Sequence, residues 1–158
     1  MRIVAIDPGL SGAIALLDTD AGASVWDMPT MDRGIGTKKR VNMASLCFIV
    51  SHCFADEGLV EEVSARPNQG VTSMFNFGES FGIAMTSISA ANVRLNLVKP
   101  QVWKKHFNLR SNKEDSRHLA IELFPDLSEQ LERKKDNGRA EALLMALWFK
   151  HSREACAK

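Results

Sequence analysis

The first seventeen residues constrain the fold most strongly, because they place one carboxylate at the junction of two apolar runs. Arg2 to Ile6 alternates and is β-branched, and Ala13 to Leu17 is a second apolar run after a Pro-Gly turn. This pattern predicts two strands of a hairpin. Asp7 closes the first strand. Aspartate is a poor strand residue and is costly to bury without a partner. We therefore expect Asp7 to stabilise a turn, to bind a cation or to bind a proton.

The composition predicts a single α/β domain spanning residues 1–158. This length suffices for one full core, and the chain has no apolar run of about 18 residues or more, so we expect no membrane span. No signal-peptide pattern opens the chain, which favours a cytoplasmic location. The three cysteines are odd in number and form no CxxC pair, which predicts reduced thiols.

Net charge does not indicate a nucleic-acid partner, because the formal charge is only +1. The basic residues are nevertheless clustered in three places, at 38–40, at Lys99 with 104–105, and at 133–135. A solvated surface is the simplest explanation of any one such cluster. Three clusters that flank acidic residues favour a polyanionic partner instead.

Hydrophobic periodicity along the rest of the chain predicts alternating strands and helices. We expect strands at Ala23–Met28, Gly58–Val63 and Val93–Val98, loops at Pro29–Thr37 and Ala65–Gly70, and helices at Asn42–Phe54, Val71–Ala91, Pro100–Phe107, Ser111–Phe124 and Arg139–Lys150. Gly78 and Gly82 within one helix predict close packing against a neighbour. This order predicts a five-stranded mixed sheet, with three antiparallel strands followed by two parallel ones, flanked by helices.

Acidic residues from distant parts of the chain can meet in such a sheet. If Gly58–Val63 is a strand, Glu61 and Glu62 point to opposite faces, so only one of them can share a site with Asp7. The last helix adds Asp136 and Glu141. Clustered carboxylates repel one another unless hard divalent cations bind them, so we expect Mg²⁺. Two such ions would support phosphodiester hydrolysis.

At these residues the chain resembles the RuvC-type Holliday junction resolvases of the ribonuclease H-like superfamily. The resemblance rests on four spaced blocks, IDPGLSGAIAL, VEEV, VKPQVWKK and KKDNGRAEALLMAL, and covers nearly the whole chain. It implies a homodimeric endonuclease that nicks four-way DNA junctions symmetrically with Mg²⁺ or Mn²⁺. We expect no membrane attachment and no nucleotide cofactor, and the lack of a transit-peptide pattern favours the cytoplasm of a bacterial or phage-infected cell.

The resemblance implies that Asp7, Glu61, Asp136 and Glu141 bind two metal ions. The commonest bacterial pattern has two acids three residues apart on the last helix, but Gly138 stands three residues before Glu141 here. The spacing of Asp136 is instead similar to that of phage and plant organellar relatives. Five residues of one helix separate side chains by about 140°, so we expect Asp136 to lie in the loop before the helix.

Basic and polar residues are the DNA contacts that the resemblance implies. Lys99, Lys104 and Lys105 correspond to residues near the scissile phosphate, and either Lys104 or Lys105 would stabilise charge in the transition state. Phe75 is a candidate for base stacking. The other implied contacts are Lys38, Lys39, Arg40, Arg66, Asn68, Gln69, Arg133, Lys134 and Lys135.

Three other functions share parts of this pattern. A nucleotide-binding domain of the actin and sugar-kinase type has the same core, but it needs a second lobe that 158 residues do not supply. A nuclease of the same fold that cuts RNA–DNA hybrids or other branched nucleic acids fits the acidic residues equally well. A non-catalytic junction-binding module fits less well, because unneutralised acids next to phosphates lower its affinity.

Overall fold

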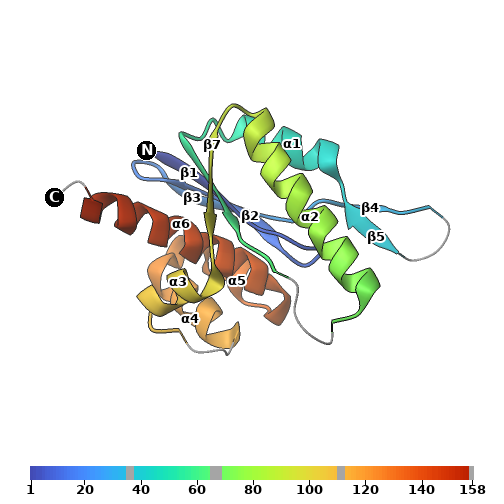
Figure 1. The fold of residues 1–158 in the computed structure, drawn as a ribbon. Helices are drawn as coiled ribbons and strands as arrows, with labels where there is room; N and C mark the ends of the chain where they lie inside the picture. The colour runs from blue at the N-terminus through green and yellow to red at the C-terminus, as the bar shows by residue number, and fades with distance from the viewer. Residues whose placement is uncertain (35–37, 65–68, 110–112, 157–158) are drawn as a thin grey trace.

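We describe the fold from a computed structural model that places residues 1–34, 38–64, 69–109 and 113–156 (Figure 1). Five strands form a mixed sheet in the order β3-β2-β1-β6-β7. β1 to β3 are antiparallel neighbours, whereas β6 and β7 run parallel to β1. The predicted mixed sheet is confirmed. Its strands are β1 (Arg2–Asp7), β2 (Ala13–Asp18), β3 (Gly22–Asp27), β6 (Glu57–Glu61) and β7 (Arg94–Val98).

Helices cover both faces of the sheet. One face packs against α1 (Met43–His52) and α2 (Val71–Ala90), and the other packs against α6 (Asn137–Cys156) (Figure 1). The side chains of β1 alternate between these two cores, as the pleat requires. The remaining helices lie in the layer of α6 and are α3 (Pro100–His106), α4 (Lys113–Leu123), α5 (Ser128–Leu131) and the 3₁₀ turns Pro125–Leu127 and Lys134–Asp136.

The segment predicted as a loop at Pro29–Thr37 contains a strand and leads into a second one. β4 (Thr30–Asp32) pairs with β5 (Lys39–Val41) as a separate two-stranded sheet. The prediction was wrong because three-residue strands are too short to show an alternating pattern. Arg33 holds this hairpin to α2 through hydrogen bonds to Asn76 and Glu79.

Two predictions about the helices also need correction. α6 continues to Cys156, beyond the expected end at Lys150, and the Arg153 guanidinium on its last turns pairs with Glu57 at 2.7 Å. This ion pair joins the helical turns beyond Lys150 to β6. Gly78 and Gly82 were expected to pack closely, but a Cβ built on either one meets no described atom within 4 Å. These two glycines therefore lie on an open face of α2.

The start of α6 packs very closely against the turn between β1 and β2. A Cβ built on Gly138 would lie 2.6 Å from the backbone oxygen of Ser11, and one built on Gly12 would lie 2.0 Å from the oxygen of Asp7. Any larger side chain at either position would force the backbone apart. The two glycines thus let the first turn of α6 reach the end of β1, where Asp7 lies.

The sequence predicted neither a membrane span nor a disulfide bond, and the described residues bear on both predictions. None of the helices placed there is both long and apolar enough to cross a lipid bilayer. Cys47, Cys53 and Cys156 are unpaired, as expected for reduced thiols. Burial of Cys53 raises the pKa of its thiol to about 11, so this thiol is protonated at neutral pH and unreactive.

Candidate active site

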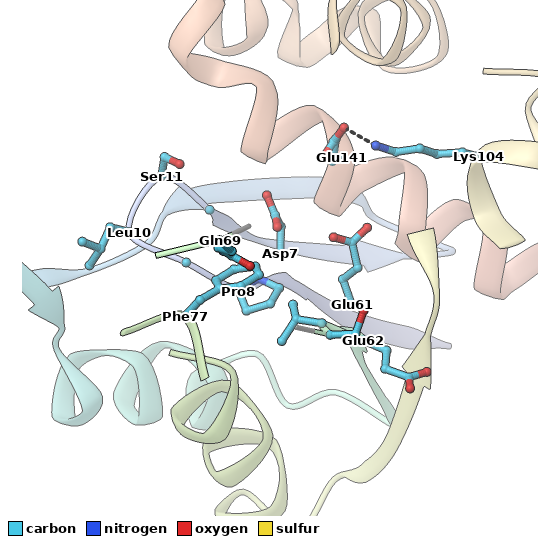
Figure 2. A pocket seen from close by; sticks show the side chains of 14 residues that line it. Asp7, Pro8, Leu10, Ser11, Glu61, Glu62, Gln69, Phe77, Lys104 and Glu141 are labelled. Carbon is cyan, nitrogen blue, oxygen red and sulfur yellow. Dashed lines mark hydrogen bonds and ion pairs between the residues drawn. The ribbon is translucent and has the colours of Figure 1, made fainter. Parts of the chain in front are cut away.

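A cavity of about 430 Å³ opens where the carboxyl ends of β1 and β6 meet the first turns of α6 (Figure 2). Asp7, Glu61 and Glu141 line it together with Lys104 of α3. The parallel register pairs Ile6 with Val60, so Asp7 and Glu61 each follow a paired residue at the same edge. Three of the four predicted acids therefore lie around one cavity, although they come from residues 7, 61 and 141 of the chain.

The strand geometry separates the two adjacent glutamates of β6. Figure 2 shows the Glu61 carboxylate pointing toward Asp7 and Glu141, while the Glu62 side chain points away from them. The Trp103 indole Nε1 donates a hydrogen bond to Glu61 Oε1 at 2.9 Å. Glu61 is therefore the member of the pair that is placed to act with Asp7.

Lys104 supplies a positive charge inside the cavity. Its Nζ lies 2.8 Å from Glu141 Oε1, and the Glu141 side chain is only 11% exposed (Figure 2). The ion pair offsets part of the repulsion among the three acids. Lys105, the other candidate lysine, is exposed and does not line the cavity. The structure thus places Lys104, and not Lys105, next to the acids.

The structure does not bring Asp136 to this cavity. Asp136 lies in the 3₁₀ turn before α6, as expected, but its carboxylate accepts hydrogen bonds from Arg133 N, Nε and Nη2 at 2.9 to 3.1 Å. The residue is 1% exposed. Burial alone would raise the pKa of Asp136, but the Arg133 hydrogen bonds and the charges of Arg133 and Arg139 hold it below its ordinary value. The expectation that Asp136 joins the other acids is not met. Its carboxylate instead accepts the Arg133 hydrogen bonds that cap the 3₁₀ turn before α6.

Gly138 explains why the acidic pair on the last helix is missing here. It occupies the position three residues before Glu141, where the commonest pattern has an acid, and its Cα faces the backbone of Ser11 and Gly12. The Cβ of an aspartate at position 138 would lie only 2.6 Å from the backbone oxygen of Ser11. A larger residue at position 138 would therefore require α6 and the turn after β1 to move apart.

The donor set is chemically suited to a hard cation. Carboxylate oxygens are the ligands that Mg²⁺ and Mn²⁺ prefer, and three carboxylates line the cavity. Within the described ranges, however, no three His, Cys, Asp or Glu side chains are close enough together to hold one ion. Side-chain rotation would therefore have to accompany cation binding, and Glu141 would exchange part of its contact with Lys104 for the ion.

The predicted DNA-contacting residues lie in several places. Gln69 lines the cavity, and Phe75 is 69% exposed on α2. Arg66 and Asn68 lie outside the described residues. The remaining basic residues are exposed, namely Lys38, Lys39, Arg40, Lys99, Lys105, Arg133, Lys134 and Lys135. Two of them have acidic partners, since Arg133 contacts Asp136 and Lys134 lies 3.3 Å from Glu114.

Two residues of the site were missed by reading the sequence. Phe77 lines the cavity and packs against the turn after β1, where a Cβ on Gly9 would lie 3.2 Å from its ring. Helical spacing alone indicates a core position for Phe77, so it gives no sign of a role at the site. Trp103 is fully buried and contacts Glu61. The available signal was that a buried tryptophan needs an acceptor for its N–H.

Comparisons with known proteins identify the fold. A scan against protein-family models found no match, and a search of curated protein sequences found none either. Among solved structures, Thermus thermophilus RuvC is 15% identical, with 96% of each chain covered and a TM-score of 0.60. T. thermophilus RuvC in complex with a Holliday junction substrate is 16% identical, covers 94% of this chain and 91% of that one, and has a TM-score of 0.65. The fowlpox virus Holliday junction resolvase is 15% identical over 96% of this chain and 99% of that one, with a TM-score of 0.47. The chain therefore has the predicted ribonuclease H-like fold, in the arrangement seen in RuvC.

The capping role of Asp136 predicts a stability effect of Asp136→Asn. At neutral pH the variant should lose about 1 kcal/mol of unfolding free energy, because the charged acceptor of the Arg133 hydrogen bonds is removed. The folded-state pKa of Asp136 is lowered, so its contribution is present above the unfolded-state pKa and disappears as the pH falls through the folded-state value. Urea unfolding at neutral and acidic pH measures the difference.

The matched control is Asp126→Asn, which makes the same chemical change at an exposed residue. We expect it to leave the unfolding free energy unchanged at both pH values. Equal stability of Asp136→Asn and the native protein at neutral pH would contradict the capping role.

Proposed function

We propose that this protein is a metal-dependent endonuclease that resolves four-way DNA junctions by paired symmetric nicks. The observation that carries the proposal is the cavity at the ends of β1 and β6, where Asp7, Glu61 and Glu141 lie around Lys104 in a fold shared with RuvC. One of the similar RuvC structures is a complex with a Holliday junction substrate. Carboxylates that converge at the edge of such a sheet are suited to metal-assisted phosphodiester hydrolysis.

The three acids would hold two Mg²⁺ or Mn²⁺ ions, because their side chains lie around the same cavity (Figure 2). When bound, such ions lower the pKa of a water molecule and stabilise the leaving oxygen. Asp136 takes no part in this proposal, because its carboxylate is held by Arg133. The acids thus orient the ions and the scissile phosphate.

Lys104 would stabilise the phosphate during cleavage. Its Nζ is paired with Glu141 in the structure. If Glu141 served as a cation ligand instead, the Lys104 Nζ would be available to an oxygen of the scissile phosphate. A preorganised cation aimed at developing charge is an effective source of transition-state stabilisation.

The exposed basic residues would bind the phosphates of the junction arms. Lys39 and Arg40 belong to β5, and Lys38 directly precedes it. Lys99 directly precedes α3, and Lys105 is exposed on that helix. Phosphate contacts of this kind position the DNA but carry no sequence information. We therefore expect binding to be strongly salt-dependent.

A cleavage assay tests this function directly. The purified protein is incubated with a labelled four-way junction, a linear duplex and an RNA–DNA hybrid, each with Mg²⁺ and with Ca²⁺, and the products are resolved on a denaturing gel. We expect symmetric nicks in the junction with Mg²⁺ only. Asp7→Asn should abolish cleavage while it retains junction binding, because only a metal ligand is lost.

Other results would redirect the function. Cleavage of the hybrid with an intact junction would favour a ribonuclease of the same fold. Junction binding without cleavage by the native protein, under either cation, would favour a non-catalytic module. An active Asp7→Asn variant would contradict the metal-binding role of the acids.

The position of Lys104 predicts different effects for two adjacent lysines. Lys104→Ala should lower the single-turnover cleavage rate about 100-fold or more, because the charge next to the scissile phosphate is lost. Lys105→Ala is the matched control, since it removes the same group from an exposed position. It should mainly weaken junction binding. Equal rate losses in the two variants, measured at saturating protein, would contradict the assignment to Lys104.

A homodimer would bring two such sites to one junction, and the exposed face of α2 is suited to form it. α2 has twenty residues, of which only Glu79 is charged, and Glu79 already pairs with Arg33. Val71 is 84% and Phe75 is 69% exposed on this helix. Gly78 and Gly82 leave open space on the same face. An uncharged, partly apolar helix face with small residues favours contact with a second copy of the chain.

Mass measurement by light scattering tests the dimer. We expect the native protein to have the mass of two chains, and Gly82→Arg to have the mass of one, because a long charged side chain would fill the contact. Gln130→Arg adds the same charge on α5, away from α2, and should remain dimeric. A monomeric native protein, or a dimeric Gly82→Arg variant, would contradict this interface.

A further inference from the structure

Trp103 lies directly behind one of the three acids of the site. It is 0% exposed, and its ring belongs to the core between the sheet and α6. The only polar atom of its side chain, Nε1, donates to Glu61 Oε1 at 2.9 Å. Glu61 itself is half-buried at the edge of the cavity. One side chain therefore joins the hydrophobic core to a candidate metal ligand.

The chain order creates this contact. β7 pairs with β6 so that Val98 lies opposite Glu61, and the backbone N–H of Glu62 donates to the oxygen of Val98 at 2.7 Å. α3 begins with Pro100, two residues later. Trp103 is the fourth residue of α3, so it lies in the same core as Val98, the last residue of β7. The contact follows from a tight connection between β7 and α3.

The core fixes the direction of the hydrogen bond. The indole ring is packed among apolar groups and cannot turn without opening a cavity. A glutamate side chain has several rotamers of similar energy and is far easier to move. The ring therefore gives the Glu61 carboxylate one fixed hydrogen-bond donor, and the carboxylate satisfies a donor that would otherwise be buried without a partner.

We propose that Trp103 is a positioning residue, which uses its indole N–H to keep the Glu61 carboxylate at the cavity, where it can take part in cation binding. This inference rests on the proposed function. Lys104, the next residue of α3, contacts Glu141 at the same time, so this short helix orients acids that come from β6 and from α6. Partners that orient metal ligands typically contribute about 10- to 100-fold to metal affinity.

Mn²⁺ affinity without DNA is the appropriate readout, since it does not depend on cleavage. Free Mn²⁺ is measured by electron paramagnetic resonance in titrations of the full native chain, Trp103→Phe, Glu61→Gln and the double variant. We expect Trp103→Phe to bind Mn²⁺ about tenfold more weakly than the native protein. In the Glu61→Gln background the same change should have no further effect, because the carboxylate it positions is gone.

Trp148→Phe is the matched control. Trp148 is a partly buried tryptophan at the edge of the same core, on α6, so its replacement removes the same indole group away from the acids. It should lower the thermal stability but leave the Mn²⁺ affinity unchanged. If Trp103→Phe does not fold, replacement of Trp103 by 3-benzothienylalanine keeps the ring volume and removes only the N–H donor.

The outcomes separate this inference from the proposed function. Unchanged Mn²⁺ affinity of the folded Trp103 variant, or an equal loss in the Glu61→Gln background, would overturn the positioning role and leave the nuclease assignment standing. A native protein that binds no Mn²⁺ would overturn both.

Discussion

The contact between Gly138 and the turn after β1 is the constraint on which the candidate site depends. A helix normally approaches a sheet at the distance set by its side chains, but here the backbone of α6 nearly touches the backbone of residues 11 and 12. Glu141 lies one helical turn further on and therefore reaches the cavity beside Asp7. The same contact leaves no room for an acid at position 138. This geometry thus accounts for the position of Glu141 in the cavity.

Two residues of α3 offset part of the repulsion among the acids. Lys104 neutralises Glu141, and Trp103 gives Glu61 a hydrogen bond from the core. Both residues lie on a seven-residue helix that directly follows the strand next to β6. The acids are therefore kept apart and oriented by contacts within the chain. In our proposal, the three acids would hold the cations, and Glu141 would then give up part of its contact with Lys104.

The sequence predicted those features that depend on strand periodicity and chain order. The apolar runs before Asp7 and Glu61 indicate parallel strands, and parallel strands place their ends at one edge of the sheet. The same reasoning does not reach Asp136, because nothing in the spacing shows that Arg133 captures its carboxylate. Trp103 was missed for a similar reason, since its partner is 42 residues away in the chain. Contacts between side chains decided both cases, and periodicity carries no information on them.

In our proposal, Asp7, Glu61 and Glu141 bind the two cations, and Asp136 does not. A crystal structure of the protein soaked in Mn²⁺, with anomalous scattering recorded at the manganese edge, tests it most directly. We predict anomalous density between the carboxylates of Asp7, Glu61 and Glu141, with Asp136 still bonded to Arg133. Density at Asp136, or no density in the cavity at saturating Mn²⁺, would contradict this assignment of the cation-binding acids.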